Sequence, residues 1–298
     1  MTGNDGNKWE QLPHTEGLKN EVLMFRSQIP GYKYASVVHM PGCDVVQIGD
    51  EQGLDPDAIA PAVTAKTACV MLPQHLTDWY DCPPRRLSKI CDAAHELGIP
   101  VVVDAAYLNY PLDLFRSFTG AGADLVCFSA KYFGGPNAGG FVIGREDLMR
   151  SVAGLDFTRY ESGVYRIFGR PFKMGRYEVV AVALALESWL NEDHQARWQS
   201  YAARVGVIQG ALPPVEGMSA TAAFFTMDER LEPKPINCLA LQFSNECRVN
   251  ADMVAERLAE GVPSIASIPM GDKLVLAVDA MTDQHAQTIS TRLPDALR

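Results

Sequence analysis

The 298-residue sequence has no long apolar run, no closely spaced pair of cysteines and no basic tract. Apolar runs such as residues 99–103 and 125–128 have the length of strands, whereas a helix that spans a bilayer needs roughly 20 residues. The polar first residues lack the basic-then-apolar order of a secretory signal. We therefore expect no membrane helix and a cytoplasmic protein.

Seven cysteines are scattered through the sequence without any C-x-x-C pair. This spacing argues against a zinc site or another metal site, and several of the cysteines occupy apolar patterns in which a free thiol packs as a small hydrophobic side chain. The formal net charge of −10 repels phosphate backbones. The sequence also lacks a Lys/Arg-rich run with interleaved aromatic residues. We expect a reducing compartment, no metal and no nucleic-acid partner.

From about residue 21 onward, apolar runs of strand length alternate with helix-like periodic segments, which predicts an α/β domain with a mainly parallel sheet. Between the third and fourth predicted strands, Pro83 and Pro84 begin a helix that Gly98 ends. The predicted strands are residues 22–25, 45–48, 69–72, 101–104, 125–129 and 140–143.

The length of the chain favours two domains. We predict a large domain over residues 1–185 and a smaller α+β domain over residues 186–298, bridged by a long helix over residues 176–190 with a broad apolar face. Pro213 and Pro214 mark a break within the smaller domain. Beyond it we predict strands at residues 238–243 and 274–278, and helices at residues 250–259 and from Thr282 onward.

Two of the predicted buried strands end in polar residues. Asp104 ends one strand, Ser129 ends another, and Lys131 follows shortly after Ser129. In parallel sheets ligands bind beyond the carboxyl ends of the strands, so these side chains are expected to face one crevice. A lysine amine and an acidic partner for a ring nitrogen are what pyridoxal 5′-phosphate (PLP) requires of a protein. The sequence therefore predicts a PLP site in which Lys131 carries the cofactor as a Schiff base.

Neighbouring residues complete the predicted site. Ala106 is small enough for a flat ring to lie against the backbone, and Ser129 could donate its hydroxyl to the cofactor phosphate. The pair Gly134-Gly135 would let the main chain approach a ligand or a second subunit closely. Taken singly, an Asp at a strand end is more often a cap and a Lys in a Gly-rich loop is usually solvated. The order in which these residues occur favours the cofactor site.

The motif that carries a family resemblance is Asp104-Ala-Ala followed by GADLVCFSAKYFGGPNAGG over residues 122–140. It resembles the selenocysteine synthase-related group of PLP enzymes, which includes bacterial L-seryl-tRNA(Sec) selenium transferase and D-glucosaminate-6-phosphate ammonia-lyase. Residues 17–22 and 169–178 also resemble segments of this group, and the resemblance extends over residues 14–190. It implies the PLP-dependent transferase fold of type I and a homodimer.

The resemblance also implies roles for single residues. Lys131 matches the lysine that forms the Schiff base, and Asp104 matches the residue that pairs with the pyridine nitrogen. Gln74 and His75 occupy the place where such enzymes present a polar side chain to the cofactor ring, although His75 could equally cap a loop. Three basic residues lie at or just before the start of the long helix: Arg170, Lys173 and Arg176. They either bind a carboxylate or phosphate of the substrate or form a solvated first turn of the helix.

Two departures from the group stand out. The Gly/Ser/Thr-rich helix start that cradles the cofactor phosphate precedes the segment where this chain starts, which predicts weak PLP binding by this chain alone. A truncated gene, a phosphate site supplied by another subunit, or a homologue that has lost catalysis would each explain this. The remaining strands are expected to leave an uncovered edge or face that favours oligomerisation. The compact Ser129-Ala-Lys131 spacing disfavours a tRNA substrate.

The first functional hypothesis is a PLP-dependent lyase that acts on a small amino acid or amino-sugar acid. It would abstract the α-proton and then eliminate a β-substituent, with Lys131 as the general base once substrate has freed it. The alternatives are a PLP-dependent transferase, either an aminotransferase or a selenium transferase, and a non-catalytic homologue that serves as a binding subunit.

Overall fold

The computed structural model describes residues 1–30, 32–73, 84–227 and 229–298. It divides into two compact units, Met1–Asn191 and Glu192–Arg298, and each unit has a sheet of its own. The boundary expected between residues 185 and 186 falls inside helix α7 (Arg176–Asn191), whose helical pattern continues to the end of the first unit. Within the described residues, none of the helices is both long and apolar enough to span a membrane.

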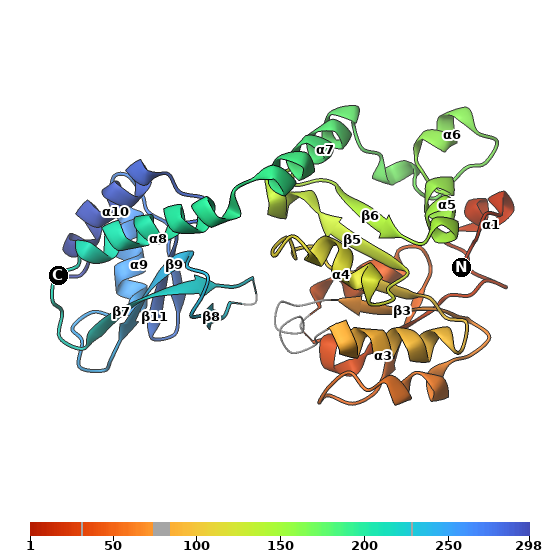
Figure 1. Cartoon of the computed structure of the whole chain (residues 1–298), viewed down its shortest axis with the longest axis horizontal. Coiled ribbons are helices and arrows are strands. Elements are labelled where there is room, and N and C mark those ends of the chain that lie inside the picture. The colour runs from red at the N-terminus through yellow and green to blue at the C-terminus, as the bar shows by residue number, and fades with distance from the viewer. Residues whose placement is uncertain (31, 74–83, 228) are drawn as a thin grey trace. The chain divides into compact units, whose positions relative to one another are not determined.

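The first unit contains a six-stranded sheet in the order β2-β1-β3-β4-β5-β6 (Figure 1). All neighbours pair in parallel except β5 and β6, which are antiparallel. The strands are β1 (Glu21–Phe25), β2 (Asp44–Ile48), β3 (Thr67–Pro73), β4 (Val101–Asp104), β5 (Leu125–Ser129) and β6 (Gly140–Gly144). Each of the six predicted strands is therefore present, and the mixed, mostly parallel sheet agrees with the predicted α/β class.

The other elements of the first unit are helices. The α-helices are α1 (Gly6–Gln11), α3 (Pro84–His95), α4 (Leu114–Gly120), α5 (Glu146–Gly154), α6 (Thr158–Ser162) and α7. The 3-10 helices are η1 (Arg26–Gln28), η2 (Lys33–His39), η3 (Pro56–Ala58), η4 (Ala60–Ala62), η5 (Ala130–Phe133) and η6 (Arg170–Phe172). As predicted, Gly98 follows α3 in a left-handed conformation, with φ +67°.

The two faces of the large sheet differ in how they are covered. On the first face, alternate strand residues such as Val103 and Val126 pack against α3 and α4, which lie in front of the sheet in Figure 1. On the second face, Val22 and Met24 pack against Tyr32. Over β4 to β6 the same face carries Cys127, which is half-buried, and Val142, which is exposed. As far as the structure describes the chain, the second face is therefore open around these two side chains.

Asp124 joins three elements at the amino end of β5. Its carboxylate accepts hydrogen bonds from the Val101 amide at 2.7 Å, His95 Nε2 at 2.8 Å and Arg145 Nη1 at 2.6 Å. The Asp124 side chain is only 3% exposed. Its buried charge is therefore stabilised by these three donors, and Asp124 in turn provides the acceptor for the Val101 amide. Asp124 thus fixes the start of β4 against α3 and β6.

Replacing Asp124 with alanine is expected to lower the free energy of unfolding by about 3 kcal/mol, because it leaves the Val101 amide without its acceptor in a buried position. Denaturant unfolding followed by circular dichroism measures this change. Asp147 binds the same arginine but is 62% exposed, so D147A is the matched control and should cost less than about 1 kcal/mol. Equal losses in the two variants would contradict this role for Asp124.

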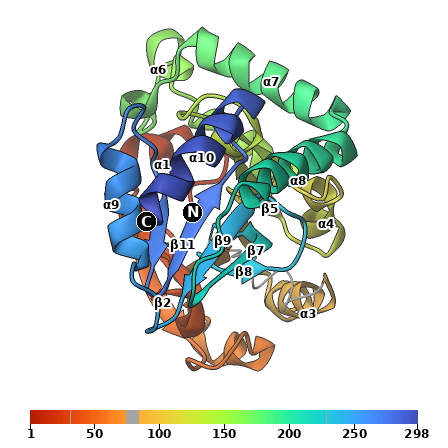
Figure 2. The ribbon, with the colours of Figure 1, turned by 90° about the vertical axis from the view of Figure 1, so that its left-hand side faces the viewer.

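The second unit is an antiparallel sheet with helices packed on one face (Figure 2). Apolar residues of the helices, such as Ile208, Val254 and Leu293, pack against Leu241 and Leu276 of the sheet. The strand order is β10-β11-β9-β7-β8. The elements are α8 (His194–Gly210), β7 (Met218–Phe225), β8 (Leu231–Glu232), β9 (Cys238–Phe243), α9 (Ala251–Glu260), β10 (Ile268–Met270), β11 (Lys273–Ala277) and α10 (Asp283–Ala296).

Candidate active site at the carboxyl ends of β3 to β5

Three neighbouring parallel strands end together in the first unit. Pro73 ends β3 and pairs with Asp104, the last residue of β4, which in turn pairs with Cys127 of β5. The amide of Ser129, the last residue of β5, donates at 2.9 Å to the carbonyl of Ala106, which lies just beyond β4. The structure thus brings together Asp104, Ala106 and Ser129, as the sequence predicts for the carboxyl edge of a parallel sheet.

The Asp104 carboxylate is held by donors from three different segments. Its Oδ1 accepts the Ala106 amide at 3.1 Å and lies 3.6 Å from Cys127 Sγ. Its Oδ2 accepts the Tyr32 hydroxyl at 2.7 Å. Among the described residues, no Lys, Arg or His forms an ion pair with this carboxylate. Its negative charge is therefore available to a cationic group of a ligand.

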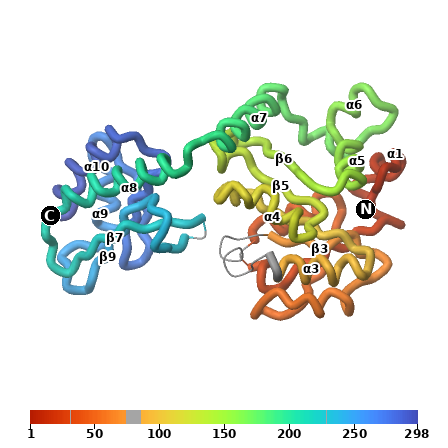
Figure 3. Tube along the Cα trace, viewed as in Figure 1, coloured from red at the N-terminus to blue at the C-terminus, as the bar shows by residue number. Residues whose placement is uncertain are grey.

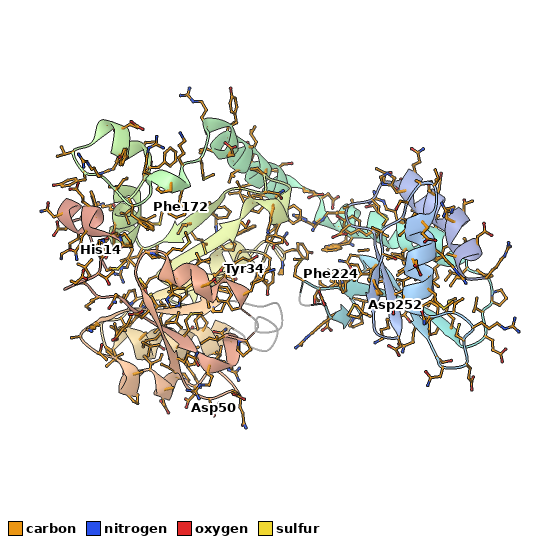
Figure 4. All side chains as sticks on the ribbon, turned by 180° about the vertical axis from the view of Figure 1, so that it is seen from behind. His14, Tyr34, Asp50, Phe172, Phe224 and Asp252 are labelled. Atoms are coloured by element: carbon orange, nitrogen blue, oxygen red, sulfur yellow. The ribbon has the colours of Figure 1, made fainter. Side chains whose placement is uncertain are left out.

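Tyr32 reaches this carboxylate from the connection between β1 and β2. The segment is fixed over the strand ends by Gln28, whose Nε2 donates to the Pro73 carbonyl at 2.8 Å. Burial first, and then the Asp104 carboxylate, raise the pKa of the Tyr32 hydroxyl far above its ordinary value, so Tyr32 stays a hydrogen-bond donor. The neighbouring Tyr34 projects from the side of the unit seen in Figure 4, opposite α3 and α4.

Cys127 contacts the same carboxylate. Burial, followed by the Asp104 charge and hydrogen bond, raises the pKa of the Cys127 thiol to about 12. The thiol is therefore protonated at neutral pH, and it acts as a weak donor to Asp104 and not as a nucleophile.

Alkylation of Cys127 is expected to be at least about 10³-fold slower at pH 8 than that of an ordinary thiol, because its thiolate fraction is about 10⁻⁴ there. The rate should rise about tenfold per pH unit from pH 7 to 10. Iodoacetamide labelling with peptide mass spectrometry measures it, with the half-buried Cys247 as an internal comparison. D104N should accelerate labelling of Cys127 by removing a negative charge, and unchanged labelling would contradict the contact.

Lys131 lies in η5, immediately beyond the end of β5, and is exposed. Its Nζ lies 4.8 Å from the centroid of the Tyr132 ring, and among the described residues no carboxylate pairs with it. The turn itself is anchored, because Asn109 Nδ2 donates to the Tyr132 carbonyl and Trp189 Nε1 of α7 donates to the Asn109 carbonyl at 2.8 Å. The lysine is therefore an exposed amine on an anchored turn.

The two glycines after Lys131 allow the tight turn in which this lysine lies. Gly134 ends η5 with φ +82°, a conformation that favours glycine. A Cβ on Gly135 would lie 2.7 Å from the Ala130 Cβ, so the close approach expected of this pair is made within the same turn. The chain then reverses into β6, as the trace from β5 to β6 in Figure 3 shows.

Three other residues predicted for the site remain: Gln74, His75 and Arg170. Gln74 and His75 lie outside the described residues, directly after Pro73. Arg170 forms an ion pair with Glu161 at 2.7 Å and lies over the Tyr160 ring, with 5.5 Å from Cζ to the centroid. None of its contacts within the described part of the chain reaches Asp104 or Lys131. Its assignment to substrate binding stays a prediction.

The residues present fit PLP. Asp104 offers a fixed carboxylate to a protonated ring nitrogen, and Lys131 offers an amine to an aldehyde. The open second face of the sheet, with Cys127 and Ser129 half-buried, provides a surface for a flat ring. Tyr32 and Cys127 are the two contributors that the sequence did not reveal.

Comparison with solved structures identifies the fold of this chain. D-glucosaminate-6-phosphate ammonia-lyase superposes with a TM-score of 0.76 over 99% of this chain and 76% of that chain, at 20% identity. A structure of SPT with the PLP internal aldimine superposes with a TM-score of 0.52 over 94% of this chain and 67% of that chain, at 16% identity. This chain has the PLP-dependent fold of type I. The predicted fold is thereby confirmed.

One curated relative resembles the chain in sequence. It is 5′-C-glycyluridine monooxygenase-decarboxylase from Streptomyces sp, 25% identical over 226 residues, which make up 75% of this chain and 53% of that protein. The chain therefore spans about half the length of that relative. No protein-family model matches the chain.

Proposed function

We propose that this chain is a PLP-dependent lyase that releases ammonia from a small amino acid or amino-sugar acid. The observation that carries the proposal is the Asp104 carboxylate, which has no described cationic partner and is fixed at the end of β4 next to the turn that carries Lys131. The fold shared with D-glucosaminate-6-phosphate ammonia-lyase over almost the whole chain supports it.

Lys131 and Asp104 have separate tasks in this proposal. PLP, when bound, withdraws electrons from the substrate carbon next to the amino group. The Asp104 carboxylate holds a proton on the ring nitrogen, and the Lys131 amine anchors the cofactor until substrate displaces it. The freed amine then takes the α-proton, and the C–H electron pair forms a double bond to the β-carbon as the β-substituent leaves with its own bonding pair. Hydrolysis of the resulting enamine releases ammonia.

Ammonia release without a keto-acid acceptor is the test of this reaction. Purified protein with PLP is incubated anaerobically with candidate amino acids and amino-sugar acids, and ammonia is measured by a coupled assay. We expect release that does not depend on an acceptor or on oxygen. Strict dependence on a keto acid would instead support a transferase.

The Streptomyces relative supports a second candidate, an oxygen-dependent decarboxylation of an amino acid. This reaction would use the same Lys131 and Asp104 but would remove the carboxyl group instead of the α-proton. Oxygen consumption together with release of carbon dioxide would favour it over the lyase, and the anaerobic assay separates the two because only the decarboxylation needs oxygen.

We also propose that the protein acts as a homo-oligomer, such as a homodimer, in the cytoplasm and without a nucleic-acid partner. Large apolar side chains are exposed on α7, namely Tyr177, Val179, Val180 and Leu184, and the second face of the large sheet is open over β4 to β6. The six described cysteines are all free, which suits a reducing compartment. Sedimentation velocity measures the assembly, and a monomer at micromolar concentration would contradict it.

A further inference from the structure

Tyr32 makes the shortest of the contacts to Asp104, and it comes from a segment without any predicted role. The hydroxyl donates to Asp104 Oδ2 at 2.7 Å across 72 residues of sequence. The Tyr32 side chain is 8% exposed, so solvent does not compete strongly for this bond. A charge-assisted hydrogen bond in a protected position is stronger than one at the surface.

The surroundings of Tyr32 show that its position is built into the fold. Its ring packs with Val22 and Met24 of β1 and with Cys43 on the second face of the sheet. Gln28 holds the same connection to the end of β3 through the Pro73 carbonyl. This connection places the Tyr32 hydroxyl beyond β3, next to Asp104 at the end of β4. There it contacts Oδ2, the carboxylate oxygen that does not bind the Ala106 amide.

The three donors divide the two oxygens of Asp104 between them. Oδ1 takes the Ala106 amide and the weak thiol donor of Cys127, whereas Tyr32 is the one donor to Oδ2 among the described residues. An ionised carboxylate has about four acceptor positions. Tyr32 therefore fixes the rotation of the carboxylate and still leaves an acceptor position for a ligand. Without the hydroxyl, Oδ2 has no described partner.

We infer that Tyr32 is a positioning residue for the PLP site: it acts through Asp104 by fixing the carboxylate that receives the protonated ring nitrogen. The inference rests on the proposed function, because it assigns Asp104 to the cofactor. It predicts that Tyr32 affects PLP affinity only while Asp104 is present.

The test is a double-mutant cycle with Y32F, D104A and the double variant, in which PLP binding is titrated by visible absorbance. Y32F keeps the buried ring and loses only the hydroxyl. We expect the dissociation constant of PLP to rise about tenfold in Y32F, the magnitude of one charge-assisted hydrogen bond. In the D104A background the same change should alter the constant less than about twofold. Y34F, on an exposed tyrosine two residues away, is the matched control and should behave as wild type.

Cofactor-free protein provides an independent reading of the contact. The same cycle on the unfolding equilibrium should show a coupling of about tenfold between Tyr32 and Asp104. The absence of that coupling would overturn the inference, as would an equal loss of PLP affinity from Y32F with and without Asp104. If wild-type protein binds PLP and Y32F binds it equally well, the inference about Tyr32 is refuted and the proposed function is not. Wild-type protein that does not bind PLP at millimolar concentration would overturn the proposed function and the inference with it.

Discussion

K131A is expected to lose PLP-dependent ammonia release by at least about 10³-fold, the largest effect of any single substitution in this chain. The side chain supplies both the covalent anchor of the cofactor and the base for the α-proton, and general-base catalysis alone contributes about 10²–10⁴-fold. Steady-state kinetics with saturating PLP measure the loss. The fold should be unaffected, because the side chain is exposed and its amine lies over the Tyr132 ring.

The matched control for Lys131 is Lys89, an exposed lysine on α3. K89A should retain full activity and the visible absorption of bound PLP, whereas K131A should lose the absorption of a covalently held cofactor. Full activity of K131A would exclude Lys131 from the chemistry.

D104N is expected to lower turnover by about 10³-fold while leaving the protein folded. Asparagine has nearly the same shape. Its single carbonyl oxygen can still accept from the Ala106 amide while its NH2 group donates to the Tyr32 oxygen, but it carries no charge to hold a proton on the ring nitrogen. Loss of a preorganised electrostatic contact of this kind costs about 10²–10³-fold or more in turnover. The effect should be much larger than that of Y32F, which removes one donor and leaves the charge in place.

Kinetics and absorption spectra of D104N, measured beside D92N, check this expectation. Asp92 is exposed on α3 and serves as the matched control. A reduced turnover in both variants would point to a loss of stability, and an unchanged turnover in D104N would refute the assigned role of Asp104.

The sequence predicts the large sheet well because its strands are apolar runs separated by clear turn residues. β4 is Val-Val-Val-Asp, and its partner β5 begins with Leu-Val, so both period and composition indicate strands. The position of Asp104 and Ser129 at the carboxyl ends of these strands then follows from the topology of parallel sheets. In the second unit the sequence does not predict β7, because Met218–Phe225 is rich in Ala, Ser and Thr and carries no strong strand signal.

The partners of Asp104 could not be predicted because they depend on register and on a non-local contact. In the sequence, Cys127 has the pattern of a small hydrophobic residue of a strand. Only its pairing with Asp104 in the sheet brings the thiol to the carboxylate. Tyr32 lies in a connection of 3-10 helices and turns whose course over the strand ends is not encoded by any periodic pattern. Arg170, which the sequence suggests for an anion site, forms an ion pair with Glu161, and its assignment to substrate binding stays a prediction.

Borohydride reduction of the protein with bound PLP, followed by peptide mapping, tests most directly whether Lys131 holds the cofactor. Reduction fixes the cofactor to the lysine that holds it. We predict a single labelled peptide that contains Lys131, with no label in K131A and an unchanged label in K89A. A label on any other lysine, or no label on wild-type protein at millimolar PLP, would contradict the assignment of Lys131.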